Sequence, residues 1–177
     1  SEYDAVLITI GASTDKKLGL EGEDADGVIS AVQFLRDVGK DEALDLTGKE
    51  VAVVGGGNVS MDAVRTAKRL GAKKVSIVYR RRMADMTALP GEINGAVAEG
   101  IELQTLKAPA AIDVDENNHV KGIYVTPQMV STIKNGRASV RPTGEDDIYI
   151  PCDMGLLQFS DDGKFIRSVS RKGQGPG

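Results

Sequence analysis

The order of apolar and polar segments along the chain predicts alternating strands and helices. Apolar residues run almost unbroken through 50–54, as expected for a strand that is covered on both faces, and a second strand is expected at 74–79, where Val75, Ile77 and Val78 are apolar. Between them, over 58–70, apolar residues recur every three or four positions, which is typical of an amphipathic helix. The whole segment has the size of one βαβ unit, roughly 30 residues. This unit is the clearest structural signal in the sequence.

The remaining segments extend this pattern and then change it. An apolar strand is expected at 2–10, an acidic Gly-rich loop at 19–27, a helix at 28–38, a polar connector at 40–48, a helix that starts at a proline at 90–99, and a strand at 101–106. Three short apolar runs then follow, separated by turns rich in Asn, Asp and Gly, at 111–114, 120–125 and 148–150. They predict an antiparallel meander appended to a parallel core.

Composition and charge exclude several classes of protein. The chain has 177 residues, 41% of them hydrophobic, which fits one globular domain. Cys152 and His119 are its only cysteine and histidine, so a disulfide scaffold and a classical zinc site are both excluded. The net charge of −4 argues against nucleic acid or an anionic membrane as a partner. The single cysteine and the lack of an export signal at the first residues favour a cytoplasmic location.

The glycine-rich turn after the first strand of the βαβ unit carries the candidate chemistry. Gly55-x-Gly57-x-x-Ser60 follows a strand and opens a helix, the context in which a G-x-G-x-x-G/A pattern indicates dinucleotide binding. Gly55 permits the tight turn, Gly57 lets a pyrophosphate approach the backbone, and position 60 must be small for the helix to pack on the strand. The helix N-terminus then attracts the phosphates. The candidate cofactor-binding residues here are Gly55, Gly56, Gly57, Asn58, Val59 and Ser60.

A second signal follows the next strand. An acidic residue that would bind the adenosine ribose is expected there, but the chain has no Asp or Glu between Asp62 and Asp85. It has Arg80, Arg81 and Arg82 instead. Arginine can bind a 2′-phosphate with two parallel hydrogen bonds and stack on adenine, so Arg80 and Arg81 favour NADPH over NADH. We interpret the other basic residues nearby as a solvated surface: Arg65, Lys68, Arg69, Lys73 and Lys74.

Two other interpretations of the glycine-rich turn stay open at this point. A methyltransferase also uses such a turn, although the missing acidic residue disfavours it. The turn can also be a structural feature that binds no ligand. Together, the βαβ unit, the further strands and the meander predict an α/β fold. We expect a Rossmann-like, three-layer nucleotide-binding domain with a parallel sheet, helices on one face and an antiparallel β-meander on the other.

The residues that carry these signals also carry a family resemblance. The sequence at 55–70, followed by Val78-Tyr79-Arg80-Arg81, resembles the NADPH-binding domain of glutamate synthase small-subunit-like flavoproteins of the pyridine nucleotide-disulphide oxidoreductase superfamily. Residues 3–12 resemble the strand of that family that passes from the FAD domain to the NADPH domain, which adds Gly11 to the candidate cofactor-binding residues. Pro151-Cys152-Asp153 resembles the start of the return strand.

The resemblance implies a function for the segment. In such enzymes NADPH gives a hydride to FAD, and electrons leave through an iron–sulfur or other electron-accepting domain or subunit. The cofactors carry that chemistry, so we expect no catalytic residue and no metal site in this segment, and no activity without the FAD domain. Residues 1–169 are then one NAD(P)H-binding domain excised from a larger flavoprotein. Within it, 1–47 form the crossover strand and connector, 48–157 form the nucleotide-binding core, and 170–177 form a flexible tail.

Two sequence features support an alternative function. Ser60 stands where Gly or Ala is usual, and the sequence at 154–161 does not continue into the usual turn near the flavin. These departures allow a non-catalytic interaction domain that keeps the fold but binds the cofactor weakly or not at all.

Overall fold

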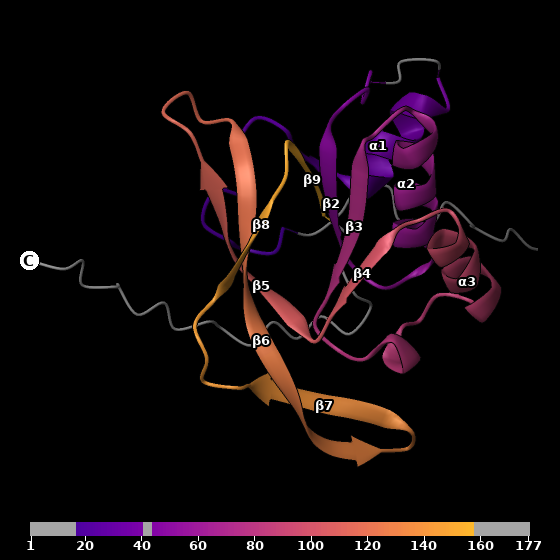
Figure 1. Cartoon of the computed structure of the whole chain (residues 1–177), viewed down its shortest axis with the longest axis vertical. Helices are drawn as coiled ribbons and strands as arrows, with labels where there is room; N and C mark the ends of the chain where they lie inside the picture. The colour runs from indigo at the N-terminus through magenta and orange to yellow at the C-terminus, as the bar shows by residue number, and fades with distance from the viewer. Residues whose placement is uncertain (1–16, 41–43, 158–177) are drawn as a thin grey trace, which may run out of the picture.

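A five-stranded parallel sheet forms the centre of the structure. The structure is a computed structural model that describes residues 17–40 and 44–157. The strands lie in the order β1-β9-β2-β3-β4, and every neighbouring pair is parallel (Figure 1). Their bounds are β1 (Val28–Ser30), β2 (Glu50–Val54), β3 (Lys74–Tyr79), β4 (Glu102–Thr105) and β9 (Met154–Leu157). The central strand β2 therefore has its successors β3 and β4 on one side and β9 and β1 on the other.

Three helices cover one face of this sheet: α1 (Ala31–Val38), α2 (Asn58–Arg69) and α3 (Pro90–Ala98). Ser30 caps α1 by accepting a hydrogen bond from the backbone N–H of Gln33 (3.1 Å). Gly71, with a φ of +92°, allows the chain to turn sharply after α2. The apolar residues between helices and sheet form one core, whose fully buried members include Phe34, Val53, Met61, Val64, Val75 and Ile77.

An antiparallel meander covers the other face of the sheet (Figure 1). Its strands are β5 (Lys107–Val114), β6 (Val120–Lys134), β7 (Arg137–Pro142) and β8 (Ile148–Pro151), and β6 pairs with each of the other three. A second core lies between meander and sheet, formed by Ala52, Val54, Val78, Ile112, Val120, Ile123, Val125, Ile150 and Cys152. The three-layer α/β architecture expected from the sequence is thereby confirmed.

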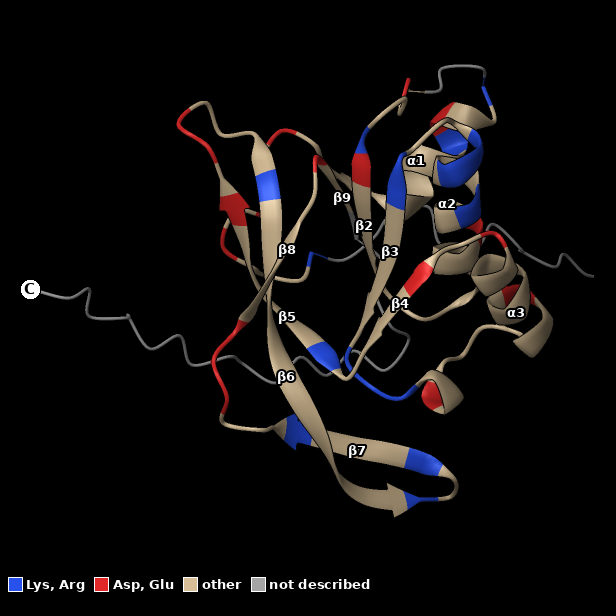
Figure 2. Cartoon of the chain, viewed as in Figure 1, with Lys and Arg blue, Asp and Glu red and all other residues tan. Residues whose placement is uncertain are grey.

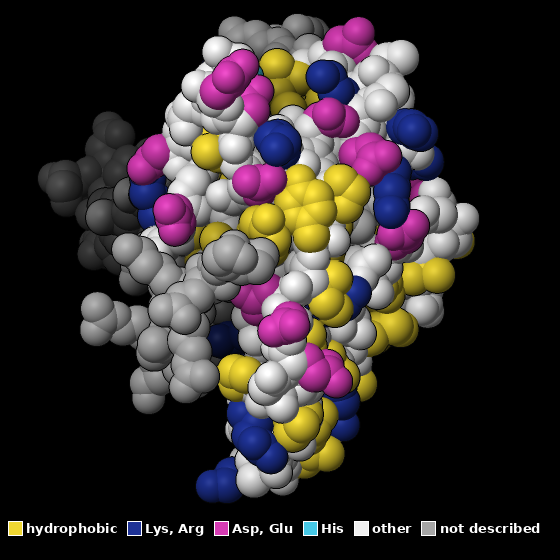
Figure 3. Space-filling model, turned by 60° about the vertical axis from the view of Figure 1, so that its left-hand side comes forward, with side chains coloured by type: hydrophobic (Ala, Val, Ile, Leu, Met, Phe, Trp, Pro, Cys, Tyr) yellow, Lys and Arg dark blue, Asp and Glu magenta, His cyan; other side chains and the backbone are white. Residues whose placement is uncertain are grey.

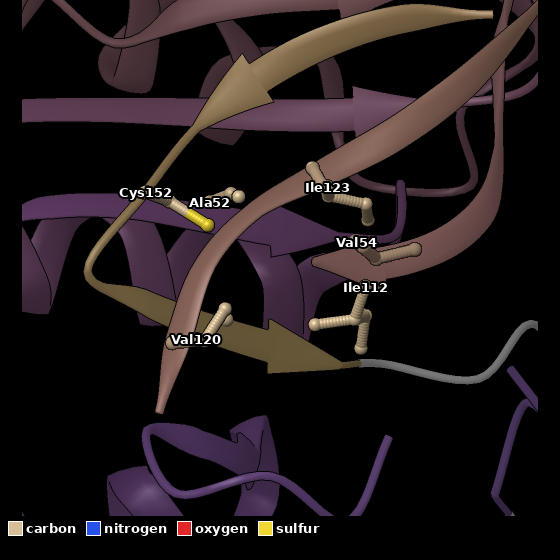
Figure 4. Close-up of a pocket in the computed structure, with 8 residues that line it drawn as sticks. Ala52, Val54, Ile112, Val120, Ile123 and Cys152 are labelled. Carbon is tan, nitrogen blue, oxygen red and sulfur yellow. The ribbon is translucent and has the colours of Figure 1, made fainter. Parts of the chain in front are cut away.

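Cys152 lies within this second core, beside a small apolar cavity. Figure 4 shows its sulfur beside Ala52 of β2, and Ile123 of β6 lines the same cavity. Burial is the main cause that raises the pKa of the thiol, to about 12, because desolvation disfavours the thiolate. The thiol is therefore a poor nucleophile at neutral pH.

The outer face of the meander remains partly apolar. Tyr124 on β6 and Tyr149 on β8 are exposed, and their rings lie 5.1 Å apart. Ile148, the residue before Tyr149 on β8, is also exposed. Figure 3 shows hydrophobic side chains gathered on this face among acidic ones.

Local sequence patterns mislocated several elements. Residues 28–30, expected to start a helix, form β1, because they pair with residues 155–157 of β9. The strand expected at 111–114 starts four residues earlier, and the one expected at 120–125 continues to Lys134 as one side of a hairpin with the unpredicted β7. The strand expected at 2–10 lies outside the described residues.

The β6–β7 hairpin extends beyond β8 and bends beneath the parallel sheet (Figure 1). Its turn consists of Asn135 and Gly136, with φ values of +50° and +79°. Positive φ at both positions is typical of the type I′ turn, whose twist suits a two-residue hairpin. The hairpin brings buried Ala138 against the short 3₁₀ helix η1 (Met83–Asp85), which follows β3.

Membrane and metal signals are both lacking in the part of the chain that the structure describes. Within 17–40 and 44–157, none of the helices has the length and apolar character needed to cross a bilayer. In the same ranges, His, Cys, Asp and Glu side chains form no cluster of three or more that suits a metal ion.

The buried core predicts a clear difference between two isoleucines. Ile77→Ala, at a position on β3 that is 0% exposed in the core between the sheet and the helices, should lower the free energy of unfolding by about 2–5 kcal/mol, because it leaves a cavity. Ile133→Ala, at a position that is 55% exposed on the hairpin, should change it by less than about 0.5 kcal/mol. Urea unfolding of both variants measures the difference, and equal effects would contradict this description of the core.

Candidate functional site

The turn between β2 and α2 leaves an open helix N-terminus. Gly55 has a φ of +147°, a conformation that favours glycine, and its N–H donates to the carbonyl of Val78 (3.0 Å). Gly57 is the N-cap residue of α2 and has no side chain that can cap the helix. The first turn of α2 contains no acidic residue. The N-terminal amides and the positive end of the helix dipole are thus available to an anion.

The start of α2 packs closely on the sheet. Ser60 is 0% exposed, and Val59 packs against the helix-side core. The small serine side chain therefore meets the steric requirement for which Gly or Ala is usual at this position. The structure gives no sign that Ser60 loosens the contact between helix and strand.

The 80–89 loop, which follows β3, is hydrogen-bonded to the glycine-rich turn. The carbonyl of Gly56 accepts hydrogen bonds from the N–H groups of Thr87 and Ala88 (both 3.0 Å). Asn58 Oδ1 accepts one from the N–H of Leu89 (2.9 Å). The ring of Tyr79 lies so close to Gly56 that a Cβ there would be 2.6 Å from Tyr79 Cε2. Gly56 is therefore required by packing, while Gly55 is required by its backbone conformation.

The predicted arginines lie at the same edge of the sheet as this turn. The register pairs Val54 with Val78, so the two strands end side by side and their following loops are neighbours. Arg80 and Arg81 are half-buried. The carbonyl of Arg81 accepts a hydrogen bond from the N–H of Leu106 (3.0 Å), which fixes this backbone to the start of the meander. Figure 2 shows the basic loop after β3.

Arg82 forms an ion pair within its own loop. Its Nε donates to Asp85 Oδ2 (2.8 Å) and its guanidinium also donates to Oδ1 (2.9 Å), which makes a two-pronged ion pair. The Asp85 side chain is fully buried, and the hydrogen bonds from Arg82 hold its pKa well below the usual range. Sequence reasoning missed Asp85. The sequence does mark it in one way, because Asp85 is the first acidic residue after the acid-free stretch that begins beyond Asp62.

The prediction that Arg65 belongs to a solvated surface is wrong. Its Nη1 lies 2.6 Å from Oε2 of Glu92 on α3, and its Nε lies 2.8 Å from Oε1 of Glu99, the C-cap residue of α3. Its guanidinium rests over Gly95, which leaves space for it between the two glutamates. Arg65 therefore joins α2 to α3 and so belongs to the scaffold of the site.

Comparison with known proteins gives the class to which this fold and site belong. The model of the pyridine nucleotide-disulphide oxidoreductase family matches residues 1–154, and the chain belongs to that family. Among solved structures, FprA from Mycobacterium tuberculosis in complex with NADPH superposes with a TM-score of 0.66 at 20% identity, covering 88% of this chain and 49% of FprA. Thioredoxin reductase of T. acidophilum gives a TM-score of 0.59 at 18% identity over 83% of this chain and 41% of the enzyme. At these identities the similarity shows the fold.

Two curated relatives are more similar in sequence. The beta subunit of NADP(+)-dependent formate dehydrogenase of Moorella thermoacetica is 40% identical over 156 residues, covering 86% of this chain and 22% of that subunit. The small chain of glutamate synthase [NADPH] of Escherichia coli is 35% identical over 170 residues, covering 90% of this chain and 36% of that small chain. The chain thus spans about a fifth to a third of the length of these relatives.

The arrangement suits a dinucleotide with an extra phosphate. An uncapped helix N-terminus and a glycine N-cap accommodate a diphosphate, and the half-buried arginines follow the adjacent strand. β2 is also the strand at which the sheet order changes direction, where ligands of such sheets bind. The structure thus brings Gly55–57, Asn58, Val59 and Ser60 together with Arg80 and Arg81. Gly11 lies outside the described residues.

Two glycine variants test the packing of the turn. Gly56→Ala should lower the free energy of unfolding by about 1–3 kcal/mol, because buried Tyr79 donates from its hydroxyl to the Asp85 carbonyl (2.7 Å) and cannot move away. Gly91→Ala, where a Cβ meets nothing within 4 Å, should leave stability unchanged or raise it by up to about 1 kcal/mol. Thermal unfolding of the two variants compares them, and a neutral Gly56→Ala would refute the close contact with Tyr79.

Proposed function

We propose that this chain is the NADPH-binding domain of a flavin-dependent oxidoreductase. The observation that carries the proposal is the open N-terminus of α2 beside the arginines that follow β3. Two relatives whose names contain NADP(+) or NADPH, and a neighbour of the same fold in complex with NADPH, support it. The proposed domain covers residues 1–169, with 48–157 as the nucleotide-binding core.

Each candidate residue has a distinct part in the proposal. The backbone amides at Asn58, Val59 and Ser60 bind the pyrophosphate, to which the glycines at 55–57 give access. Arg80 and Arg81 bind the 2′-phosphate, so NADPH is preferred to NADH. Gly11 contributes a further cofactor contact near the crossover strand.

The contribution of the chain to the reaction is placement. When bound, NADPH supplies a hydride to a flavin. The helix N-terminus and the arginines hold the two charged parts of the nucleotide, which leaves the nicotinamide to be directed toward the flavin. Because the chain spans only part of its relatives, the FAD domain and an iron–sulfur or other electron acceptor are proposed partners that lie elsewhere in the whole protein.

Calorimetric titration with NADP+ and NAD+ tests the preference. The wild-type chain should bind NADP+ about tenfold or more tightly than NAD+, because a charge-assisted contact to the extra phosphate is worth at least about 1.4 kcal/mol. Arg80→Glu should weaken NADP+ binding by about tenfold or more and leave NAD+ binding nearly unchanged.

Lys68→Glu is the matched control, since it makes the same change of charge near the far end of α2. It should alter the preference by less than about twofold, because position 68 lies about 15 Å along the helix from the glycine-rich turn, beyond a Debye length of about 10 Å. Equal binding of both nucleotides by the wild type would refute the specificity. Binding of neither at millimolar concentration would favour the non-catalytic interaction domain.

A variant at the N-cap separates ligand binding from stability. Gly57 has φ −99° and ψ 177°, an extended conformation that other residues adopt. Gly57→Asp should leave the melting temperature equal or slightly higher, because aspartate is a good N-cap. It should abolish binding of both nucleotides, since its carboxylate occupies the anion position. Retained binding in a thermal-shift assay would show that the pyrophosphate lies elsewhere.

A further inference from the structure

We infer that Asp85 is a positioning residue for coenzyme specificity: it fixes residues 80–82 against the β6–β7 hairpin, and so holds Arg80 and Arg81 where a 2′-phosphate is bound. The inference rests on the proposed function. It adds to that function a buried carboxylate and a hairpin that touch no part of the nucleotide in the proposal.

Asp85 accepts hydrogen bonds from three residues, which lie at the end of β3, in the loop after it and in the hairpin. Its Oδ2 accepts from Arg82 Nε (2.8 Å) and from the backbone N–H of Arg82 (3.2 Å). Its Oδ1 accepts from the Arg82 guanidinium (2.9 Å) and from the N–H of Ala138 (2.8 Å). Its carbonyl accepts from the hydroxyl of Tyr79 (2.7 Å), the residue directly before Arg80. Both ends of the segment 79–82 are therefore tied to one residue.

The β6–β7 hairpin contacts both Asp85 and Arg82. Ala138 is buried, lies opposite Ile133 in the β6–β7 ladder, and donates its N–H to Asp85. The guanidinium of Arg82 also donates to the carbonyl of Gly136 in the hairpin turn (3.3 Å). Figure 2 shows the basic loop after β3 and the basic residues of the hairpin at the same end of the molecule. The position of the arginine loop thus depends on a segment more than fifty residues away.

The charge of Asp85 is what makes the connection specific. Four donated hydrogen bonds converge on a carboxylate whose side chain is fully buried. An asparagine of the same shape has one acceptor oxygen, and its amide N–H groups would face the donors of Arg82 or Ala138. A buried donor left without an acceptor is costly, so the 80–82 backbone must move away. Arg82, neutralised by Asp85, serves as a link in this network.

Asp85→Asn is the decisive variant, measured as the ratio of the dissociation constants for NAD+ and NADP+. The ratio should fall about tenfold toward unity, the size expected when one charge-assisted phosphate contact is lost. The NAD+ dissociation constant should change by less than about twofold, because the helix N-terminus is untouched. Hydrogen exchange at the Ala138 amide should become faster, since that N–H loses its acceptor.

Asp115→Asn is the control. Asp115 is a carboxylate that accepts from the N–H groups of Asn117 (2.8 Å) and His119 (2.9 Å) in a meander turn. The Asp115→Asn variant should leave the ratio of the NAD+ and NADP+ dissociation constants unchanged. Arg82→Gln keeps Asp85 but removes the ion pair, so it should lower the ratio as Asp85→Asn does. If Asp85→Asn does not fold, the ratio measured for Arg82→Gln tests the positioning role in its place.

The outcomes separate this inference from the proposed function. A wild-type chain that binds no nucleotide, or binds NAD+ as well as NADP+, overturns both. A wild-type preference that survives in Asp85→Asn and Arg82→Gln overturns the positioning role alone. A ratio that rises in Asp85→Asn also overturns it, because Arg82 would then be a phosphate ligand released from its partner.

Discussion

The parallel pairing of β2 with β3 is the constraint on which the site depends. Its register aligns Val54 with Val78, so the glycine-rich turn and the arginine loop leave the sheet side by side. Neither segment has a strong anion site alone. A helix N-terminus carries about half a unit charge, and arginines on a surface are screened by solvent. Adjacent strands lie only about 4.8 Å apart, so their loops can act on one ligand.

The glycines at this point serve different physical needs. Gly55 has a backbone conformation that other residues avoid, Gly56 makes room for the ring of Tyr79, and Gly57 starts the helix without a side chain. Tyr79 in turn is fixed through its hydroxyl to the 80–89 loop. Close packing and anion access are therefore provided by neighbouring residues of one turn, and each limits substitution for its own reason.

The sequence predicted those parts of the structure whose causes are local. The β2–α2–β3 unit follows from apolar spacing and glycine placement, and its strands have the expected bounds. β1 was missed because its identity depends on β9, which lies far along the chain. Asp85 and Arg65 were missed because an ion pair depends on which segments meet in space. A list of charged residues does not contain that information, so the arginines at 80–82 were recognised as a group while the ion pair of Arg82 with Asp85 was not.

The bond between Asp85 and Ala138 has a consequence for solubility. β7 lies at the edge of its sheet, and edge strands offer outward N–H groups to which a second chain can add. The carboxylate of Asp85 already accepts the N–H of Ala138, the second residue of that edge strand. A second chain that paired with β7 at this position would have to displace the carboxylate, so the loop after β3 makes edge-to-edge association there less favourable.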